Sequence, residues 1–271
     1  MIASNVDKKD LRVLQSKKKN LAGIAWVTGA GKGIGRHVTL GLARDGWRVA
    51  ASSRTMADLE ILVRDANKFS GAIYMYPADV TNANSITKTI KEIEIEVGPI
   101  NLAIFNAGTY IRFGVANFTA REFAEQLDIN VMGTVNCLAP IMELMKNRQS
   151  GHIAVMSSLS GYRGLPMASA YGASKAALTN MCEALKPELE TYGVRLSVVH
   201  PGFVRTTLTD RNEFPMPFLM EPDLAARRIL RGISRGQFEI SFPTRFTLIL
   251  KFVRCLPYPL YFAITRRMVQ K

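Results

Sequence analysis

The sequence predicts an α/β protein with a single doubly wound domain, in which about seven parallel strands carry helices on both faces of the sheet. Short apolar runs alternate with helical patterns from about residue 22 to residue 242. Parallel strands need long crossover connections of this kind, which are usually helices. No linker rich in Pro, Gly or Ser divides the 271 residues, and no internal repeat occurs. The strands are therefore expected to join one sheet.

Seven apolar segments have the composition and length of buried strands. They are residues 22–29, 47–53, 71–78, 100–108, 151–158, 194–202 and 237–241. Helices are expected between them, over residues 34–45, from residue 55 onward, and near residues 85–97, 120–145, 168–192 and 222–232. Thr55 is expected to cap the second helix, with Asp58 in the first turn, where a carboxylate is favourable.

Basic residues are concentrated at both ends of the chain. The net charge is +13, residues 1–20 contain six Lys/Arg and two Asp, and residues 225–271 contain ten Lys/Arg and one acid, Glu239. The segment between them is therefore neutral. A nucleic-acid enzyme would more often spread positive charge around a groove, so no nucleic-acid partner is expected. Basic ends fit either an anionic surface such as a membrane or ends that are simply solvated.

The predicted organisation is a basic leader over residues 1–20, a main domain over residues 21–245, and an apolar and basic tail over residues 246–271. The leader lacks the apolar centre of a secretory signal. Three cysteines without paired spacing fit free thiols in a reducing compartment, so we expect a cytoplasmic protein. Cys137 and Cys182, in predicted helices, are expected to be buried. The three histidines have no metal-ligand spacing, so no metal is expected.

The first predicted strand ends in the glycine-rich segment TGAGKGIG, residues 28–35. Gly29, Gly33 and Gly35 have the spacing GxxxGxG. Such glycines allow a tight turn and a close approach of the backbone to a pyrophosphate, at which the following helix directs its N-terminus. The position after a strand and before a helix favours a Rossmann-type dinucleotide site over a turn needed for packing alone.

The end of the second predicted strand indicates which dinucleotide is bound. An NAD site usually places an acidic residue there to hold the ribose 2′-hydroxyl. In this chain Ser53 and Arg54 occupy that position. Arg54 can bind a 2′-phosphate, and Lys32 in the glycine turn can supply a second positive charge. We therefore predict NADP(H) as the cofactor; the alternative is that Arg54 is only an exposed residue at a helix start.

Tyr171 and Lys175 lie four residues apart in a predicted helix and therefore share one face. A tyrosine phenol normally titrates near 10 and is a poor base at pH 7. A neighbouring lysine cation is expected to lower the pKa of Tyr171. The pair could then donate a proton to a carbonyl oxygen or accept one from an alcohol.

Six motifs follow one another in a fixed order: TGAGKGIG; ADV, with Asp79; FNAG, residues 105–108; LDINVMG, with Asn130; the pair VMSS and YGASK; and HPGFVRT. Over roughly residues 22–207 this order resembles the compact, single-domain kind of short-chain dehydrogenase/reductase. The FNAG motif departs from the family, because Phe105 replaces the first of two asparagines. The resemblance implies that the main domain is a Rossmann-type catalytic domain for an NADP(H)-dependent oxidoreductase acting on a carbonyl or secondary alcohol.

The resemblance also implies the residue roles. Tyr171 would exchange the proton, Lys175 would support Tyr171 and hold the nicotinamide ribose, Ser158 would polarise the substrate oxygen, and Asn130 would support a proton-relaying water. Ser158 is favoured over the adjacent Ser157 by its spacing from Tyr171. The implied cofactor contacts are Gly29, Lys32, Gly33, Ile34, Gly35, Ser53, Arg54, Asp79, Val80, Asn106, Ala107, Gly108, Tyr171, Lys175, Pro201, Gly202 and Thr206.

Two other expectations concern assembly and function. Family members often form homodimers or homotetramers through two long helices, which would be residues 120–145 and 168–192 here. The alternative to an enzyme is a non-catalytic protein that senses NADP and docks on a membrane or partner. An extended epimerase or dehydratase is disfavoured, because its shifted glycine spacing and longer C-terminal domain are absent.

The segment after HPG is expected to contact the substrate. Its second half is apolar, with Phe214, Met216, Phe218, Leu219 and Met220. Such a segment suits a lipid-like, steroid-like or aromatic carbonyl or alcohol, although the same side chains could instead pack on the last helices or on another subunit.

The tail, residues 246–271, is apolar but punctuated by basic residues. A membrane-spanning helix needs about 20 mainly apolar residues, and here Lys251, Arg254, Arg266 and Arg267 interrupt the run. Two short amphipathic segments hinged at LPYPL are expected instead. They could contact a membrane surface peripherally, close the substrate pocket or form a subunit interface.

Overall fold

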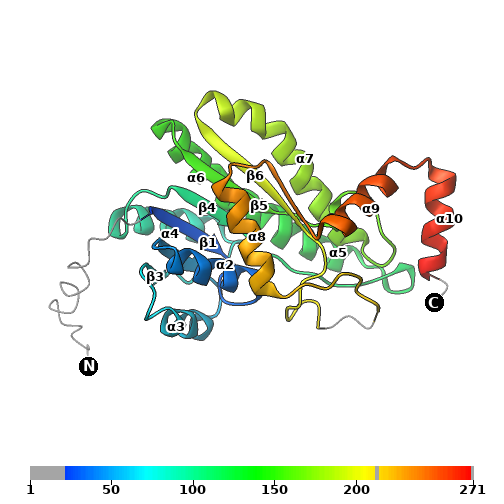
Figure 1. Cartoon of the computed structure of the whole chain (residues 1–271), viewed down its shortest axis with the longest axis horizontal. Helices are drawn as coiled ribbons and strands as arrows, with labels where there is room; N and C mark the ends of the chain where they lie inside the picture. Colours follow the sequence, from blue (N-terminus) through cyan, green and yellow to red (C-terminus); the bar gives the residue numbers. More distant parts are fainter. Residues whose placement is uncertain (1–21, 211–213, 270–271) are drawn as a thin grey trace.

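The computed structural model describes residues 22–210 and 214–269. Seven parallel strands form one sheet in the order β3-β2-β1-β4-β5-β6-β7 (Figure 1). They are β1 (Ile24–Thr28), β2 (Arg48–Ser52), β3 (Ala72–Met75), β4 (Leu102–Phe105), β5 (Gly151–Met156), β6 (Val194–Pro201) and β7 (Glu239–Phe242). The predicted doubly wound fold is confirmed, and the strand order reverses between β1 and β4, where such folds bind ligands.

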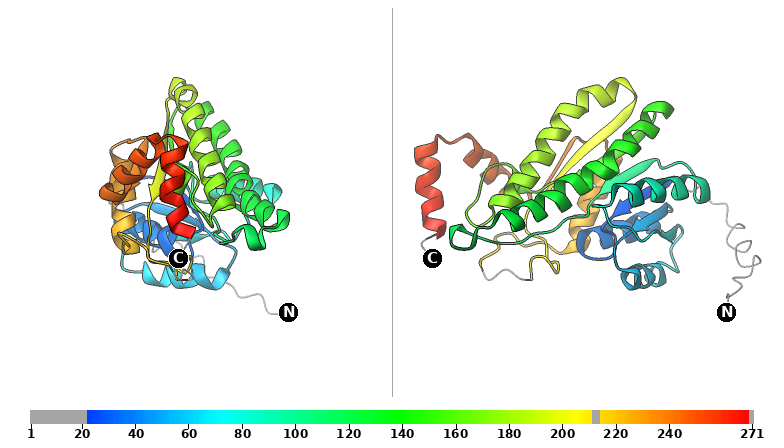
Figure 2. Two further views of the ribbon diagram at one scale, coloured as in Figure 1. Left: turned by 90° about the vertical axis from the view of Figure 1, so that its right-hand side faces the viewer. Right: turned by 180° about the vertical axis from the view of Figure 1, so that it is seen from behind.

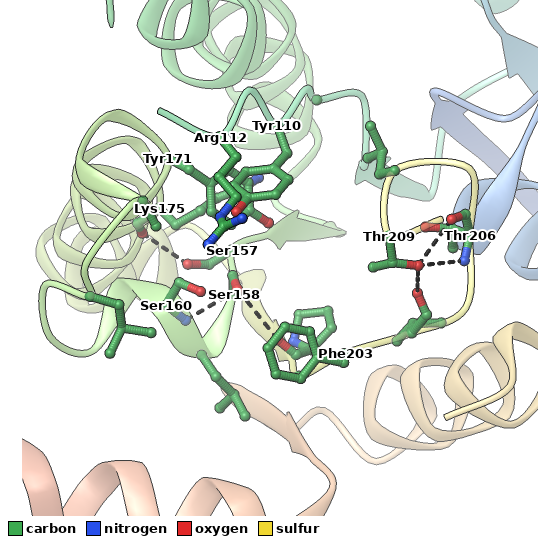
Figure 3. A pocket seen from close by; sticks show the side chains of 18 of the residues that line it. Tyr110, Arg112, Ser157, Ser158, Ser160, Tyr171, Lys175, Phe203, Thr206 and Thr209 are labelled. Atoms are coloured by element: carbon green, nitrogen blue, oxygen red, sulfur yellow. Dashed lines mark hydrogen bonds between the residues drawn. The ribbon is translucent and has the colours of Figure 1, made fainter. Parts of the chain in front are cut away.

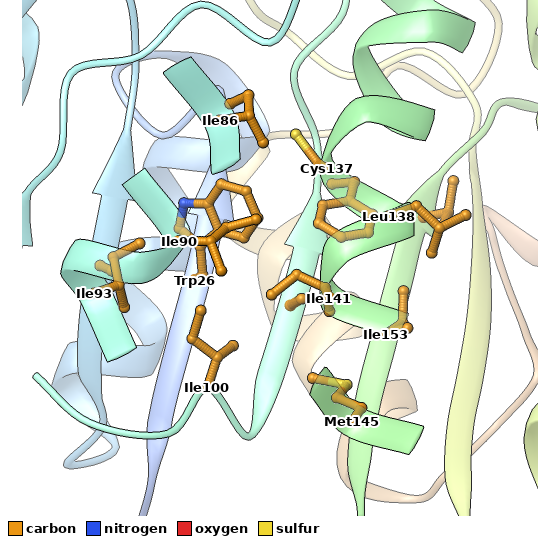
Figure 4. Close-up of a cluster of buried hydrophobic side chains, with 14 of the residues drawn as sticks. Trp26, Ile86, Ile90, Ile93, Ile100, Cys137, Leu138, Ile141, Met145 and Ile153 are labelled. Carbon is orange, nitrogen blue, oxygen red and sulfur yellow. The ribbon is translucent and has the colours of Figure 1, made fainter. Parts of the chain in front are cut away.

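Helices cover both faces of the sheet, as predicted. The helices α2 (Gly33–Arg44), α3 (Met56–Asp65) and α8 (Pro222–Ser234) supply buried side chains to one apolar cluster. The helices α4 (Ala83–Glu96), α6 (Gly133–Arg148) and α7 (Ser169–Thr191) contribute to the other. Figure 4 shows part of this second cluster, in which Trp26 packs between side chains of α4 and α6.

Strand β1 explains why the two clusters form. Ile24 and Trp26 belong to one cluster, and Ala25 and Val27 belong to the other. Successive strand residues point to opposite faces. A strand covered by helices on both sides therefore buries every residue, which is why it appears in the sequence as a continuous apolar run. The predicted burial of Cys137 and Cys182 is also confirmed.

The long helix expected over residues 120–145 is not a uniform α-helix. It consists of α5 (Ala120–Leu127), a π-helical turn (Asp128–Met132) and α6. The turn contains Asn130, whose side chain is fully buried and whose carbonyl accepts a hydrogen bond from Thr134 Oγ1 at 2.7 Å. Single π-turns inside helices frequently mark functional positions.

The predicted cap at Thr55 is wrong in its detail. Thr55 occupies the N-cap position of α3, but its side chain accepts no hydrogen bond from the first turn. Its backbone N–H instead donates to Ser53 Oγ at 3.3 Å. Asp58 does lie in the first turn of α3, as expected.

The C-terminal segment forms two short helices, α9 (Thr244–Cys255) and α10 (Tyr258–Val269), joined at Leu256 and Pro257. They lie at the end of the molecule opposite β3 and α3 (Figures 1 and 2). The predicted pair of helices hinged within LPYPL is thus confirmed. Within the described residues no helix is long and apolar enough to cross a membrane. The predicted leader, residues 1–20, lies outside the described residues.

Candidate active site

Two adjoining cavities lie along the carboxyl edge of the sheet. The larger, of about 620 Å³, is lined by Ser158, Tyr171 and Lys175 (Figure 3). The smaller, of about 320 Å³, is lined by the glycine turn and the end of β2. Both are lined by Ile34, Asn106, Gly108, Thr206 and Leu208, so together they form one elongated site.

The structure brings most of the sequence-predicted site residues to these walls. The smaller cavity is lined by Gly29, Lys32, Gly33, Ser53, Arg54, Asp79, Val80 and Ala107, and the larger by Pro201 and Gly202. Two predicted residues line neither cavity. A Cβ on Gly35 would overlap the Gly29 carbonyl oxygen, so this glycine is required for packing of the turn. Asn130 lies buried behind the larger cavity.

Tyr171 and Lys175 are one turn apart near the start of α7, and Ser158 follows β5. The Ser158 hydroxyl accepts from Ser160 N–H at 3.1 Å, at the start of the 3-10 turn Leu159–Gly161. Lys175 Nζ donates to the Met156 carbonyl at 2.8 Å and lies 5.7 Å from the centre of the Tyr171 ring. The three side chains of the predicted catalytic group therefore share one wall of the larger cavity (Figure 3).

The expected lowering of the Tyr171 pKa is not found. Burial raises the pKa of Tyr171 to about 12, and hydrogen bonding with Ser158 acts in the opposite direction. Burial also lowers the pKa of Lys175, to about 8. Removal of both groups from water disfavours their charged forms and is the largest cause of both shifts.

The adjacent serines have different surroundings. The Ser157 hydroxyl is hydrogen-bonded to the Lys175 carbonyl and to Thr179 Oγ1, each at 2.8 Å, and is thereby tied to α7. Ser158 Oγ accepts from Ser160 N–H, and as a donor it makes a long contact, 3.4 Å, with the Pro201 carbonyl. Ser158 is thus better placed than Ser157 to donate to a bound molecule, in agreement with the spacing argument.

Asn130 connects the loop after β4 to α7. Its Oδ1 accepts from Thr109 N–H at 2.7 Å, and its Nδ2 donates to the Thr109 carbonyl and to Ser174 Oγ, both at 3.0 Å. The amide is therefore fully used in positioning this loop. The implied water relay through Asn130 stays a prediction.

The smaller cavity has the features of a phosphate-binding turn. Gly29 and Gly33 have φ values of 64° and 53°, which favour glycine. Asn106 Nδ2 donates to the carbonyls of Thr28 and Gly29, which fixes the turn against β4. No side chain caps the first turn of α2, which leaves its N–H groups available to an anion.

Charges around this cavity only partly match expectation. Lys32 Nζ forms an ion pair with Asp58 Oδ2 at 3.3 Å, so its charge is shared. Arg54 lines the cavity and has no ion-pair partner among the described residues. Asp79 Oδ1 accepts from Thr81 N–H and Thr81 Oγ1, which fixes the end of the loop after β3. The glycine turn and the extended pair of cavities fit a dinucleotide.

The sequence did not indicate several residues that line the larger cavity. Tyr110 and Arg112 follow the FNAG motif, and their position after a strand was the available signal. Phe246, Leu250 and Met268 come from α9 and α10. These tail residues carry no motif, and only the packing of the tail on the main domain brings them to the cavity.

An aromatic group holds α9 against the loop after β6. Phe203 stacks on Phe246 with ring centres 5.8 Å apart, and Phe214 and Phe218 each lie 5.9 Å from one member of that pair. Such contacts add about 0.5–1.5 kcal/mol per pair beyond burial. The apolar segment predicted to contact the substrate therefore packs on the last helices and also lines the cavity through Phe214.

Arg163 attaches both tail helices to the loop that follows Ser158. Its Nη1 donates to the carbonyls of Val253, Arg254 and Leu256 at 3.0, 2.7 and 2.7 Å, at the C-terminus of α9. The guanidinium also lies over the Tyr261 ring of α10, 4.1 Å from its centre. This side chain neutralises a helix end that would otherwise expose its carbonyls.

Glu239 provides a second attachment. It accepts hydrogen bonds from Tyr162, in the loop that follows Ser158, and from Lys251 of α9. Arg163 and Glu239 together hold the tail as a wall of the cavity.

This site, with a tyrosine–lysine pair beside a serine and a glycine turn, defines a nicotinamide-dependent oxidoreductase of the Rossmann type. A family model described as short chain dehydrogenase matches residues 23–215. The chain therefore belongs to the short-chain dehydrogenase/reductase family.

Its relatives extend the likeness to most of the chain. An uncharacterized oxidoreductase of Myxococcus xanthus is 37% identical over 244 residues, which are 90% of this chain and 96% of that protein. The 17-beta-hydroxysteroid dehydrogenase 13 of Rattus norvegicus is 27% identical, over 93% of this chain and 86% of that protein.

Solved structures show the same fold. A short-chain dehydrogenase from Sphingobium yanoikuyae in complex with NADPH superposes with a TM-score of 0.75 at 24% identity, covering 82% of this chain and 88% of that one. A family member from Burkholderia phymatum in complex with NAD superposes with a TM-score of 0.78 at 21% identity, covering 84% of this chain and 92% of that one. The two complexes differ in cofactor, so the fold is common to NADPH and NAD binding.

Proposed function

We propose that this protein is an NADP(H)-dependent reductase that converts an apolar ketone or aldehyde to the alcohol. The observation that carries the proposal is the meeting of Ser158, Tyr171 and Lys175 in one cavity that continues into the glycine turn. The bound cofactor supplies the hydride, and the chain supplies the proton and the orientation.

The protonation states favour reduction. Burial raises the pKa of Tyr171 to about 12, so its hydroxyl keeps the proton at neutral pH and can donate it to a carbonyl oxygen. Ser158 can donate a second hydrogen bond to the same oxygen, where negative charge develops. Burial lowers the pKa of Lys175 to about 8, which leaves most of its positive charge in place at pH 7.

Positive charge near the end of β2 supports NADP(H) over NAD(H). Arg54 lines the smaller cavity, and the position that would hold an acid in an NAD site is Ser53. Lys32 contributes less than a free lysine would, because Asp58 is its partner. Arg54 is therefore assigned the main contact to the 2′-phosphate.

The lining of the larger cavity supports an apolar substrate. Its lining includes Phe203, Phe214, Phe246, Leu250 and Met268. A steroid is one such substrate class, and a relative named as a hydroxysteroid dehydrogenase is in line with it.

Turnover of a panel of ketones and aldehydes with NADPH tests the proposal. Tyr171→Phe should reduce kcat about a hundredfold or more and leave the Kd for NADPH within about twofold. Tyr110→Phe is the matched control, because its ring lies 4.9 Å from that of Tyr171 in the same cavity. It should retain most activity. Tight NADPH binding with no turnover of any carbonyl would instead favour a non-catalytic NADP sensor.

For partners, the proposal includes peripheral contact of α9 and α10 with an anionic membrane. Leu248, Phe252, Tyr258 and Leu260 are more than half exposed. Exposed arginines accompany them. The one acidic residue from residue 225 onward is Glu239, whose carboxylate already accepts hydrogen bonds from Tyr162 and Lys251. Apolar and aromatic side chains beside unbalanced positive charge match the interface of an anionic bilayer. The homodimer or homotetramer implied by the resemblance stays a prediction.

A further inference from the structure

The larger cavity has an unbalanced charge. Among the described residues that line it are two cations, Lys175 and Arg112, and no Asp or Glu. Lys175 is buried, and its ammonium donates to the Met156 carbonyl. Arg112 is therefore the charged side chain left for the substrate, in a cavity whose described lining residues apart from these two cations are uncharged.

The backbone on both sides of Arg112 is fixed. The fully buried side chain of Gln126 accepts from Ile111 N–H at 2.9 Å and donates to the Ile111 carbonyl at 3.0 Å. On the other side Phe113 is 2% exposed and pairs with Ala168 in an isolated β-bridge. Arg112 thus projects from a rigid frame, which lowers the entropy cost of binding a ligand.

The guanidinium of Arg112 is available for hydrogen bonds. Its Cζ lies 4.8 Å from the centre of the Phe214 ring, and it makes no hydrogen bond or ion pair with any other described residue. A guanidinium over an aromatic ring can still donate through its N–H edges. In contrast, Arg163 and Lys251, which attach the tail helices, donate to the protein itself.

Arg112 lies close to the chemical end of the cavity. Its side chain lies near that of Tyr110 (Figure 3), and the Tyr110 ring is 4.9 Å from the Tyr171 ring. The positive charge of Arg112 lowers the pKa of the Tyr110 hydroxyl, although burial has the larger effect and raises it. An anion on Arg112 would thus lie near the carbonyl that Tyr171 reduces, while an apolar body extends towards Phe246 and Leu250.

We propose that Arg112 forms an anion-binding subsite and that the substrate is an apolar carbonyl compound that also carries a carboxylate. A guanidinium and a carboxylate can form two parallel hydrogen bonds, which would orient the substrate as well as attract it. This inference rests on the proposed function in one respect only, namely that the larger cavity is the substrate site.

Direct binding separates this inference from catalysis. The probes are 4-phenylbutanoate and its neutral analogue 4-phenylbutanamide, titrated calorimetrically into the full-length protein saturated with NADP(H). The wild type should bind the carboxylate about fivefold or more tightly than the amide, with a preference that declines as salt is added. Arg112→Gln should abolish the preference, and Arg112→Lys should retain part of it because the charge remains but the paired donors do not.

Controls keep the outcome interpretable. Arg121→Gln removes a charge from an exposed site on α5 outside the cavity and should change neither affinity. The Kd for NADPH should be the same in all variants. Equal preference for the carboxylate in wild type and Arg112→Gln would overturn the inference.

Turnover then tests the proposed function on its own. An enzyme that reduces methyl 4-oxo-4-phenylbutanoate as efficiently as the free acid would keep the reductase and refute the carboxylate subsite. Carboxylate binding that depends on Arg112, without turnover of any carbonyl, would keep the subsite and refute the reductase.

Discussion

Individual residues in this site differ in how far the sequence identifies them. The spacing from Tyr171 favours Ser158 over Ser157. The hydrogen bonds that tie Ser157 to α7 give this preference a physical reason. The ionisation of Tyr171 was not predictable in the same way. The motif places a lysine beside the phenol but contains no measure of burial, and burial raises the pKa of Tyr171 to about 12.

Arg54 provides a residue-scale test of cofactor choice. Arg54→Asp should raise the Kd for NADPH at least about tenfold and the Kd for NADH much less, because the new carboxylate repels a 2′-phosphate and can accept from a 2′-hydroxyl. Arg64→Asp makes the same charge change at an exposed position on α3 and is the control. Fluorescence titration measures both constants, and equal losses for the two cofactors would argue against the 2′-phosphate contact.

Among the elements, the seven strands were the easiest to predict. Most are buried strands of a parallel sheet and therefore short apolar runs between helical patterns, although the edge strand β3 leaves Tyr74 and Met75 exposed. The helix around Asn130 was predicted as continuous, because a π-turn leaves the apolar periodicity almost unchanged. The tail helices were predicted from two prolines and the positions of basic residues. Their contact with the cavity was one of three alternatives left open, beside a membrane surface and a subunit interface, because it depends on Arg163 and Glu239 meeting partners about 90 and 12 residues away in the chain.

The tail is also the element that tests the membrane contact. The wild type should sediment with vesicles of phosphatidylcholine and phosphatidylserine, and less with pure phosphatidylcholine. The double variant Leu248→Ser, Phe252→Ser should lower the vesicle-bound fraction several-fold, because it removes exposed apolar side chains.

Ile95→Ser is the matched control, since Ile95 is 83% exposed on α4, away from the tail. Unchanged binding by the tail variant, or an equal loss with Ile95→Ser, would count against a docking role for α9 and α10. The cavity wall would then be the remaining role of the tail.

At the scale of the whole molecule, two polar groups inside the core set a limit on stability in acid. His152 Nε2 is hydrogen-bonded to Ser197 Oγ at 2.8 Å, and His200 Nε2 to Thr179 Oγ1 at 3.0 Å. Burial lowers the pKa of His152 to about 4, helped by the charge of Arg195. Burial likewise lowers the pKa of His200 to about 4, although Glu239 opposes the shift.

These shifts predict a loss of stability between pH 6.5 and pH 4. Within this window the unfolded chain binds protons that the folded chain excludes, so the free energy of unfolding falls as the pH falls. From pH 7 to pH 5 the loss should be about 2 kcal/mol for each histidine. Urea titrations at the two pH values measure it. The His152→Gln variant should be less stable at pH 7, but its free energy of unfolding should differ less between pH 7 and pH 5 than that of the wild type. An unchanged difference in the free energy of unfolding would contradict the role given to His152.

The attachment of the tail by Arg163 has a practical consequence for handling the protein. The last described residues, including Met268, border the larger cavity, whereas β3 and α3 lie at the opposite end of the molecule. An affinity tag or a surface tether joined after Lys271 would therefore exert force on the wall of the cavity. Through Arg163, the same force would act on the loop that follows Ser158. Immobilisation through a cysteine introduced on the exposed face of α3 would place no force on that wall and would direct the cavity away from the support.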